Sequence, residues 1–314
     1  MTEISIPILD DFLLNLQTNN YSLETVYNYE KDLEVFQNFL REIKTEFAVI
    51  NKKTILNYKA YLVSRDRRTA SRRRSQKQLS SFSINRMLCS LRSYLKFLAD
   101  MDYKTPISAD MIKLVKTENK YPRVGELEQI VKLIESPTRL EKNRLVALRN
   151  RAILETFFST GMRISELINL RKDQINAPGR VFIRGKGKKE RFVYLTDRAQ
   201  EHIKKYLAAR GESESPFLFL PLRGKNIHKK DRRISSNYLE EKLKQYGELL
   251  GLSIPVSPHG IRRAFATYLA EQGASPTAIQ IILGHESLDT TTRYIRASDH
   301  YAEESFRKYH PLKN

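Results

Sequence analysis

Cysteine is nearly absent from this sequence, which holds a single one, Cys89, among 314 residues. One cysteine cannot form an internal disulfide, and such scarcity fits a reducing cytoplasm. Long apolar stretches are missing too, since no run approaches the ~20 residues that a membrane-spanning helix needs. The opening residues, MTEISIPILDDFLLNL, are acidic and lack the basic-then-apolar layout of a secretion signal. We therefore expect a soluble, cytoplasmic protein with no membrane partner.

The signatures of common metal and nucleotide sites are also lacking. The sequence contains no CxxC pair, HExxH motif, EF-hand loop, P-loop or GxGxxG turn. Its acidic residues form no evident metal-binding cluster, so hydrolysis assisted by two metal ions is unsupported. We accordingly predict no metal site and no cofactor.

Positive charge is what the sequence has in excess. Lysine and arginine number 55 against 36 aspartates and glutamates, which gives a net charge of +19 and a pI near 9.8. Such a field favours polyanions and predicts binding to nucleic acid, the alternative being a basic protein that meets nucleic acid only incidentally. Forty per cent of the residues are apolar, and the length suffices for two domains with cores of their own.

Roughly the first 115 residues have the periodicity of helices. Four segments carry it: DDFLLNLQ, SLETVYNYEKDLEVFQNFLREI, KKTILNYKAYLV and SFSINRMLCSLRSYLKFLAD. Ser22 is a candidate N-cap for the second segment. Four helices joined by short polar loops predict a small bundle, taken here as residues 1–103. Residues 104–123 mix proline with charge and predict a linker to a second domain, residues 124–314.

A strongly basic stretch separates the third and fourth predicted helices. RDRRTASRRRSQKQ, residues 65–78, holds seven basic residues and one acid. It reads either as a solvated, flexible loop or as an arm that contacts phosphates. DNA binding by the protein would favour the arm.

The second domain is expected to be rich in helices with a few strands. RVFIRGKGKKERFVYL predicts a β-hairpin, because apolar residues alternate on both sides of a glycine-rich basic turn. Helices are predicted at RNRAILETFFST, SSNYLEEKLKQYGELLG and SPHGIRRAFATYLAEQG, the last two closed by Gly251 and Gly273. The predicted fold class is therefore mainly α with a small β-sheet, or α+β.

The stretch SPHGIRRAFATYLAEQG places two polar side chains at a helix N-terminus. Ser257 is a good N-cap and Pro258 a good first helical residue. His259 and Arg262 then lie three residues apart in the first turn, on neighbouring positions. Backbone N–H groups and the helix dipole favour an anion there, so a phosphate site is one interpretation. An ordinary, solvated first turn is the other.

His285 and Tyr294 are both residue types that do proton or nucleophile chemistry. On one unbroken helix, nine residues apart, they would point to opposite sides. Gly284, however, is a plausible helix stop, and Ser287 is a plausible N-cap for LDTTTRYI. A bend between them allows both side chains to face one pocket, although Tyr294 could also be an ordinary packed aromatic.

Arg163 stands two residues after Gly161, and this glycine is expected to end the preceding helix. The arginine could pair with a nearby carboxylate such as Glu166, or it could hold a phosphate in a bidentate grip. Lys186 lies in the hairpin tip, where a contact with the DNA backbone and proton donation to a leaving oxygen are both open. Lys188 and Lys189 are close enough on the same turn to take its place.

Taken in chain order, these residues are an arginine, a lysine, a His-x-x-Arg pair, a histidine and a tyrosine. A set of this kind in this order resembles the tyrosine recombinase (phage integrase) family. The matching text is TGMRISEL, GKGKKER, PHGIRRAFATYLAEQG and LGHESLDTTTRY, within roughly residues 121–310. INRMLCSLRSYLKFL is similar to the family's N-terminal core-binding domain. Because the sequence stops soon after Tyr294 and shows no extra N-terminal domain, it is most similar to the compact Xer type. The resemblance implies a catalytic set of Arg163, Lys186, His259, Arg262, His285 and the nucleophile Tyr294.

The resemblance also implies a mechanism. Tyr294 would attack a phosphodiester of duplex DNA, forming a 3′-phosphotyrosyl link and releasing a 5′-hydroxyl. The two arginines would stabilise the non-bridging oxygens, and His259 would assist proton transfer. Lys186 would protonate the departing oxygen, and His285 would hydrogen-bond the phosphate. Neither a metal nor ATP would be needed, because cations already surround the phosphate and the covalent link retains the energy of the bond.

The implied partner is a duplex DNA recombination site, clamped by the two domains. Exchange between two paired sites requires a tetramer, formed by this chain alone or with a second related recombinase. The tail YAEESFRKYHPL could dock on a neighbour or pack on its own domain. The implied DNA contacts are basic residues of the stretch 65–78, the fourth helix and the hairpin tip: Arg65, Arg67, Arg68, Arg72, Arg73, Arg74, Lys77, Arg86, Arg92, Lys188 and Lys189.

Two positions depart from the family pattern. The family often has histidine where Arg263 stands, and Thr-His where Ile295 and Arg296 follow the tyrosine. The alternatives are a type IB topoisomerase, which relaxes supercoils as a monomer, and a DNA-binding regulator with a decayed site. Within the recombinase interpretation, resolution of chromosome or plasmid dimers competes with integration and excision of a mobile element.

Overall fold

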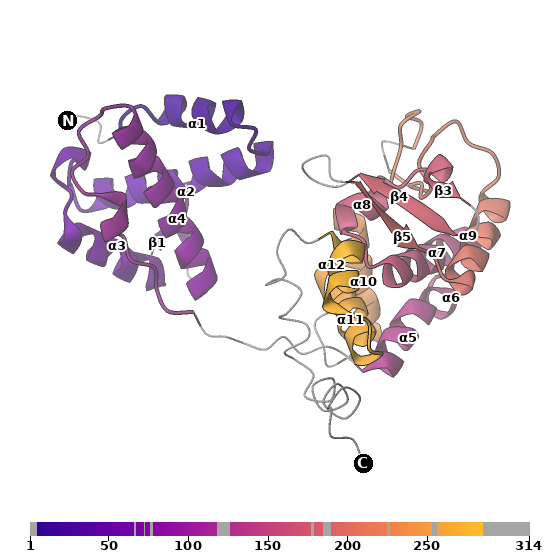
Figure 1. Cartoon of the computed structure of the whole chain (residues 1–314). Helices are drawn as coiled ribbons and strands as arrows, with labels where there is room; N and C mark the ends of the chain where they lie inside the picture. Colours follow the sequence, from indigo (N-terminus) through magenta and orange to yellow (C-terminus); the bar gives the residue numbers. More distant parts are fainter. Residues whose placement is uncertain are drawn as a thin grey trace, which may run out of the picture. The chain divides into compact units, whose positions relative to one another are not determined.

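The structure, a computed structural model, describes residues 5–65, 67–71, 73–75, 78–117, 126–176, 179–184, 190–224, 227–252 and 256–284. The chain divides into two compact units, Met1–Lys120 and Tyr121–Asn314 (Figure 1). Each unit has a hydrophobic core of its own. Among the described residues, no helix is long and apolar enough to cross a membrane.

The first unit is helical, as the sequence predicts, apart from one short strand pair. Its elements are α1 (Leu9–Thr18), α2 (Leu23–Glu42), η1 (Phe47–Val49), α3 (Lys52–Val63), β1 (Arg67–Arg68), β2 (Arg74–Ser75), α4 (Ser81–Asp100) and η2 (Ala109–Met111). Ser22 is the N-cap of α2, since its Oγ accepts a hydrogen bond from the Thr25 backbone N–H at 3.2 Å. Asn51 and Thr54 form a capping box at the start of α3.

Aromatic side chains fill the core of the first unit, and one carboxylate lies among them. Phe36 and Tyr58 are fully buried, with their ring centroids 4.8 Å apart. Asp32 on α2 accepts hydrogen bonds from Arg86 Nη1 at 2.6 Å and Ser90 Oγ at 2.8 Å, both on α4. Burial raises the pKa of Asp32 above its ordinary value despite these two partners. The buried Asp32 carboxylate therefore ties α2 to α4 through a serine and through an arginine that is half exposed.

The basic stretch contains the strand pair that the sequence reading missed. Strands β1 and β2 are antiparallel, with Arg67 opposite Ser75 and Arg68 opposite Arg74. Asn38 of α2 donates from Nδ2 to the Thr69 and Ala70 carbonyls at 3.1 and 3.3 Å. Part of the stretch is thus held against the bundle by long-range hydrogen bonds. The prediction of a wholly helical first unit did not include this strand pair.

In the second unit, several helices and the sheet pack around one long helix, α7. Its elements are α5 (Leu127–Glu135), α6 (Pro137–Leu140), α7 (Arg144–Thr160), α8 (Ile164–Ile168), η3 (Lys172–Gln174), β3 (Ile175–Asn176), β4 (Arg180–Arg184), β5 (Glu190–Tyr194), α9 (Asp197–Arg210), α10 (Ser236–Leu249), α11 (Pro258–Glu271) and α12 (Pro276–Leu283). Helix α7 is buried along most of its length and packs against α9 and α11 (Figure 1). It begins five residues before the sequence-predicted start, because Asn143 caps it with two hydrogen bonds.

A three-stranded antiparallel sheet completes this unit, in the order β3-β4-β5. The predicted hairpin is confirmed, with Arg180 opposite Tyr194 and Arg184 opposite Glu190. Val181 and Ile183 of β4 point into the core, as do Arg191 and Val193 of β5. A mainly helical fold with a small sheet matches the predicted fold class.

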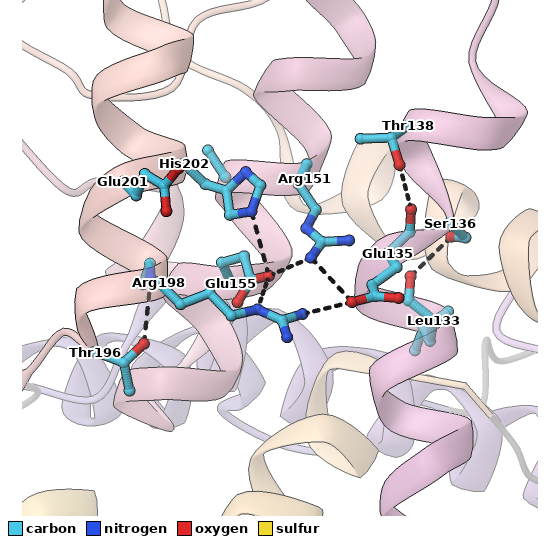
Figure 2. Close-up of polar contacts among 12 residues, drawn as sticks. Leu133, Glu135, Ser136, Thr138, Arg151, Glu155, Thr196, Arg198, Glu201 and His202 are labelled. Carbon is cyan, nitrogen blue, oxygen red and sulfur yellow. Dashed lines mark hydrogen bonds and ion pairs between the residues drawn. The ribbon is translucent and has the colours of Figure 1, made fainter.

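Helix α7 also carries charge into the interior, where an ion-pair network joins it to α5 and α9 (Figure 2). The buried Glu155 carboxylate binds Arg151 Nη2 at 2.8 Å and Arg198 Nε at 2.6 Å. Glu135 of α5 contacts the same two guanidiniums at 3.4 and 3.1 Å. Burial, and then Arg151, lower the pKa of the neighbouring His202. The network anchors the middle of α7 to its neighbours, and the C-terminus of the helix, at Thr160, leads into the candidate site.

Candidate active site

The N-terminus of α11 has the cap that the sequence predicts. Ser257 Oγ accepts a hydrogen bond from the Gly260 N–H at 3.1 Å, and Pro258 is the first helical residue. His259 follows with an exposed side chain, whereas Arg262, one turn on, is only 5% exposed. A buried guanidinium needs hydrogen-bond acceptors, so its partners define the site.

Arg262 ties α11 to the ends of two other helices. Its Nη1 donates to the Gly161 carbonyl at 2.7 Å, and its Nη2 donates to the Leu283 carbonyl at 2.6 Å. Gly161 is the C-cap of α7, as predicted, and Leu283 is the last residue of α12. One arginine thereby bridges segments that are more than a hundred residues apart in sequence.

Arg163 lies at the junction between α7 and α8. Its Nη1 contacts Glu166 Oε1 at 3.2 Å and its backbone N–H donates to Glu166 Oε2 at 2.7 Å, so the carboxylate partner anticipated from sequence is present. Its Nη2 donates to the Gly284 carbonyl at 2.8 Å. The side chain nevertheless keeps 39% of its surface exposed, which leaves room for an anion to approach.

Arg191 belongs to the same cluster, although the sequence reading did not select it. Its Nη1 and Nη2 bind the two Glu166 oxygens at 2.8 and 2.7 Å, and its Nε donates to the Ile282 carbonyl at 2.8 Å. Burial alone would raise the pKa of the Glu166 carboxyl. The hydrogen bonds from Arg191 and from the Arg163 backbone outweigh burial, so this pKa lies below its ordinary value. The sequence signal for Arg191 was its place two residues before Val193, which puts both side chains on one face of the predicted strand.

The C-terminus of α12 is therefore capped by three arginines from three different elements. The carbonyls of Ile282, Leu283 and Gly284 each accept a hydrogen bond from a different guanidinium. These are orphan carbonyls at the negative end of the helix dipole, so cations stabilise them. Gly284, at φ +65°, is the helix stop that the sequence predicts. His285 is the next residue in the chain.

The surroundings of His259 favour its neutral form. Partial removal of the imidazole from water, and then the charges of Arg263 and Arg262, lower its pKa below the ordinary value. The neutral form therefore predominates at neutral pH, and it can act as a base. Arg263, which stands where the resembled family often has histidine, contributes to this shift.

The described residues include only part of the expected set. Arg163, His259 and Arg262 are described, and the two arginines hold adjacent carbonyls at the end of α12. The other catalytic candidates and several expected DNA contacts lie outside the described residues: Lys186, His285, Tyr294, Arg72, Lys77, Lys188 and Lys189. Across the described ranges, no group of three or more His, Cys, Asp or Glu side chains could hold a metal ion.

The expected DNA contacts of the first unit differ in their surroundings. Arg65 and Arg73 are exposed, while Arg67 is buried at 8% exposure. Arg68 lies 3.5 Å from Glu42, and Arg92 lies 3.8 Å from Asp110. Arg86 has 49% of its side chain exposed beside Asp32, and the backbone of Arg74 is part of β2.

Gly161→Ala is expected to destabilise the protein more than Gly251→Ala. Both glycines follow a helix with positive φ, +58° and +61°, and an alanine in that conformation costs about 1–3 kcal/mol at either place. At Gly161 the added Cβ would also lie 2.2 Å from Phe265 Cδ1, whereas at Gly251 it meets nothing within 4 Å. Overpacking adds about 1–3 kcal/mol. Thermal unfolding measures the difference, and equal midpoints for the two variants would contradict it.

Comparisons with known proteins agree with the motifs and the fold. Residues 123–300 match the phage integrase family, and residues 9–101 match the phage integrase N-terminal SAM-like domain. Tyrosine recombinase XerC of Oceanobacillus iheyensis is 31% identical, over 98% of this chain and 96% of that protein. Tyrosine recombinase XerD of Staphylococcus haemolyticus is 29% identical, over 97% and 98%.

Solved structures share the fold. XerH recombinase bound to its difH substrate, in a pre-cleavage complex, has a TM-score of 0.71 at 20% identity, covering 97% of this chain and 89% of that one. A lambda integrase dimer bound to a COC′ core site has a TM-score of 0.69 at 15% identity, covering 91% and 75%. Both resemblances concern the arrangement of the backbone.

Proposed function

The chain belongs to the phage integrase family, and from that premise we propose that it is a site-specific tyrosine recombinase that cleaves and rejoins duplex DNA. One observation supports the proposal most directly. Arg163 and Arg262, from separate elements, both hold the end of α12 immediately before the segment that carries His285 and Tyr294. Two guanidiniums fixed at a helix junction can grip one phosphate.

The proposed reaction uses the side chains of this chain alone. The Tyr294 phenol, with an ordinary pKa of about 10, is a weak nucleophile until its proton is removed. His259 takes that proton while the oxygen attacks phosphorus. The bond from phosphorus to the 5′ oxygen then breaks, and Lys186 protonates the leaving oxygen. His285 and the two arginines stabilise the charge on the non-bridging oxygens.

Independence from metal ions and ATP follows from the same chemistry. The cationic side chains take the place of a metal at the phosphate. The 3′-phosphotyrosyl link retains the energy of the phosphodiester, so attack by a 5′-hydroxyl of the partner strand rejoins the DNA without a second energy source. The catalytic domain, residues 124–314, would clamp the duplex together with the bundle, residues 1–103, through the linker 104–123.

A tetramer on two paired sites is the proposed assembly, because each exchanged strand needs its own nucleophile. The relatives named XerC and XerD favour an Xer-type role, the resolution of chromosome or plasmid dimers in the cytoplasm, over integration of a mobile element. A second related recombinase could supply half of the tetramer. The basic residues expected to contact DNA are assigned to its phosphates, which predicts affinity that falls steeply with salt.

The test is covalent trapping on nicked DNA. The substrate is a duplex carrying a site recovered by sequencing host DNA that the protein retains, with a nick that lets the cleaved fragment diffuse away. Wild-type protein should form an adduct that survives denaturation. Relaxation of supercoiled plasmid without paired sites would instead indicate a topoisomerase, and binding with no adduct would indicate a regulator.

The rate of adduct formation should fall at acidic pH, and His259 should be the cause. Its pKa is lowered, so the imidazole is neutral until the pH drops through a value below the ordinary pKa of about 6.5. Once protonated, it can no longer accept the phenol proton. His259→Asn should be slow and should lack this acidic decline. His202→Gln is the control, because His202 also has a lowered pKa but lies in the α9 network. If the rate for His259→Asn fell at acidic pH as it does for the wild-type protein, His259 would not be the base.

A further inference from the structure

Arg191 is almost completely enclosed, although it is only the second residue of β5. Its side chain is 7% exposed, and all three of its donor nitrogens make hydrogen bonds within the second unit. We infer that Arg191 is a positioning residue for recombination, which locks the Glu166–Arg163 pair and the end of α12 into one rigid cluster. The inference rests on the proposed function, because it concerns the geometry of that reaction.

Arg191 and Arg163 share one carboxylate, that of Glu166. Glu166 Oε1 accepts from Arg163 at 3.2 Å and from Arg191 at 2.8 Å, and Oε2 accepts from both residues at 2.7 Å. Glu166 is therefore a bridge between two guanidiniums, with its side chain 8% exposed. Without Arg191 its charge would be compensated chiefly by Arg163, which would be drawn toward the carboxylate and away from a DNA phosphate.

Arg191 also contacts the end of α12. Arg191 Nε holds the Ile282 carbonyl at 2.8 Å, and a Cβ on Gly284 would lie 3.0 Å from Arg191 Cδ. The last turn of α12 is thus seated directly on this side chain. His285 follows at once, so Arg191 helps to fix the point from which the chain continues toward Tyr294.

Arg191 reaches these groups from the sheet. It is the second residue of β5, directly after the hairpin segment that contains Lys186, and the pleat turns it inward. One side chain therefore links the hairpin, the start of α8 and the end of α12. An ordinary structural ion pair would stabilise the fold and nothing more, and the two roles make different experimental predictions.

Arg191→Gln is expected to slow cleavage of the nicked duplex by about 100-fold in single turnovers, because small misplacements of reacting groups have effects of that size. Arg171→Gln is the matched control. It removes the same charge from an exposed pair with Asp173 at 3.1 Å, and it should cleave at the wild-type rate. The dissociation constants of the two variants for the duplex should be equal. Wild-type cleavage by a folded Arg191→Gln would overturn the inference.

A double substitution separates positioning from stability and covers the case in which the single variant fails to fold. Replacing a buried ion pair by apolar side chains is often neutral for stability. Arg191→Met combined with Glu166→Met should therefore unfold near the wild-type midpoint while cleavage stays slow. If cleavage recovers together with stability, the pair is merely structural and the inference is wrong.

A substrate with sulfur in place of the bridging 5′ oxygen shows which group Arg191 serves. The thiolate leaves without a proton, so Lys186→Ala should be rescued on this substrate. Arg191→Gln should remain slow, because its contacts are with Glu166 and α12. Rescue of Arg191→Gln would overturn the inference by assigning its effect to the lysine. Failure of the wild-type protein to form any adduct would instead refute the proposed function itself.

Discussion

Tyr294→Phe should form no covalent adduct with the nicked duplex, while wild-type protein accumulates it. The substitution removes one oxygen, the atom proposed to bond to phosphorus, and leaves an aromatic ring of nearly the same size. DNA affinity should stay at the wild-type level, since the basic surface is untouched. Denaturing electrophoresis measures the adduct, and mass spectrometry of the digested complex identifies the peptide that carries the nucleotide.

Two nearby tyrosines provide matched controls for the nucleophile. Tyr301→Phe and Tyr309→Phe remove the same atom 7 and 15 residues further along the chain and should retain the adduct. An adduct that persists in Tyr294→Phe and disappears in one of the other two would transfer the role of nucleophile. Loss in all three variants would point to damage to the tail as a whole, and the assignment to Tyr294 would lose its support.

Arg262→Gln should reduce the cleavage rate by about 10²–10³-fold, the usual effect of removing one preorganised donor to a developing oxyanion. It should also lower the thermal unfolding midpoint, because the Gly161 and Leu283 carbonyls each lose a donor at a buried position. Arg262→Lys keeps the charge, but one ammonium cannot reproduce the planar fork that spans both carbonyls. The lysine variant should therefore lie between glutamine and wild type in rate.

Arg210→Gln tests whether the effect on cleavage is local. Arg210 also donates to a backbone carbonyl, that of Leu218 at 2.9 Å, and its guanidinium lies 5.6 Å from the Tyr206 ring centroid. Its loss should cost stability without slowing cleavage. If both arginine variants slow cleavage in proportion to their loss of stability, a specific role for Arg262 in the reaction would be untenable.

Helices and caps could be predicted from the sequence because their signals are local. Ser22, Ser257 and Gly284 act where the pattern predicts, since a cap depends only on the residues beside it. The hairpin was likewise visible in the alternation on both sides of its glycine-rich turn. The β1–β2 pair was not, because it is made of basic and small polar residues without alternation and is held by Asn38 from a distant helix.

The candidate site was predictable only as far as a family motif reaches. Arg163 and Arg262 stand in the matched text, and for Arg163 the pairing with Glu166 was one of the two interpretations offered. The two-residue period of a strand puts Arg191 on the same face as Val193, but a single sequence cannot show that its carboxylate partner lies 25 residues earlier. Nor can it show that three guanidiniums meet at one helix end, because that depends on how distant elements pack.

The end of α12 has a consequence for how the pocket comes into being. The helix, PTAIQIIL, has no basic residue in its own last turn, so the cations at its carbonyls are all supplied by other elements. Alone it would be short and poorly terminated. The three guanidiniums reach these carbonyls only when the sheet, α8 and α11 are packed against the helix end, so the last turn of α12 and the arginine cluster depend on one another. A chain in which any one of these elements is displaced would lose part of the helix cap and part of the candidate site together.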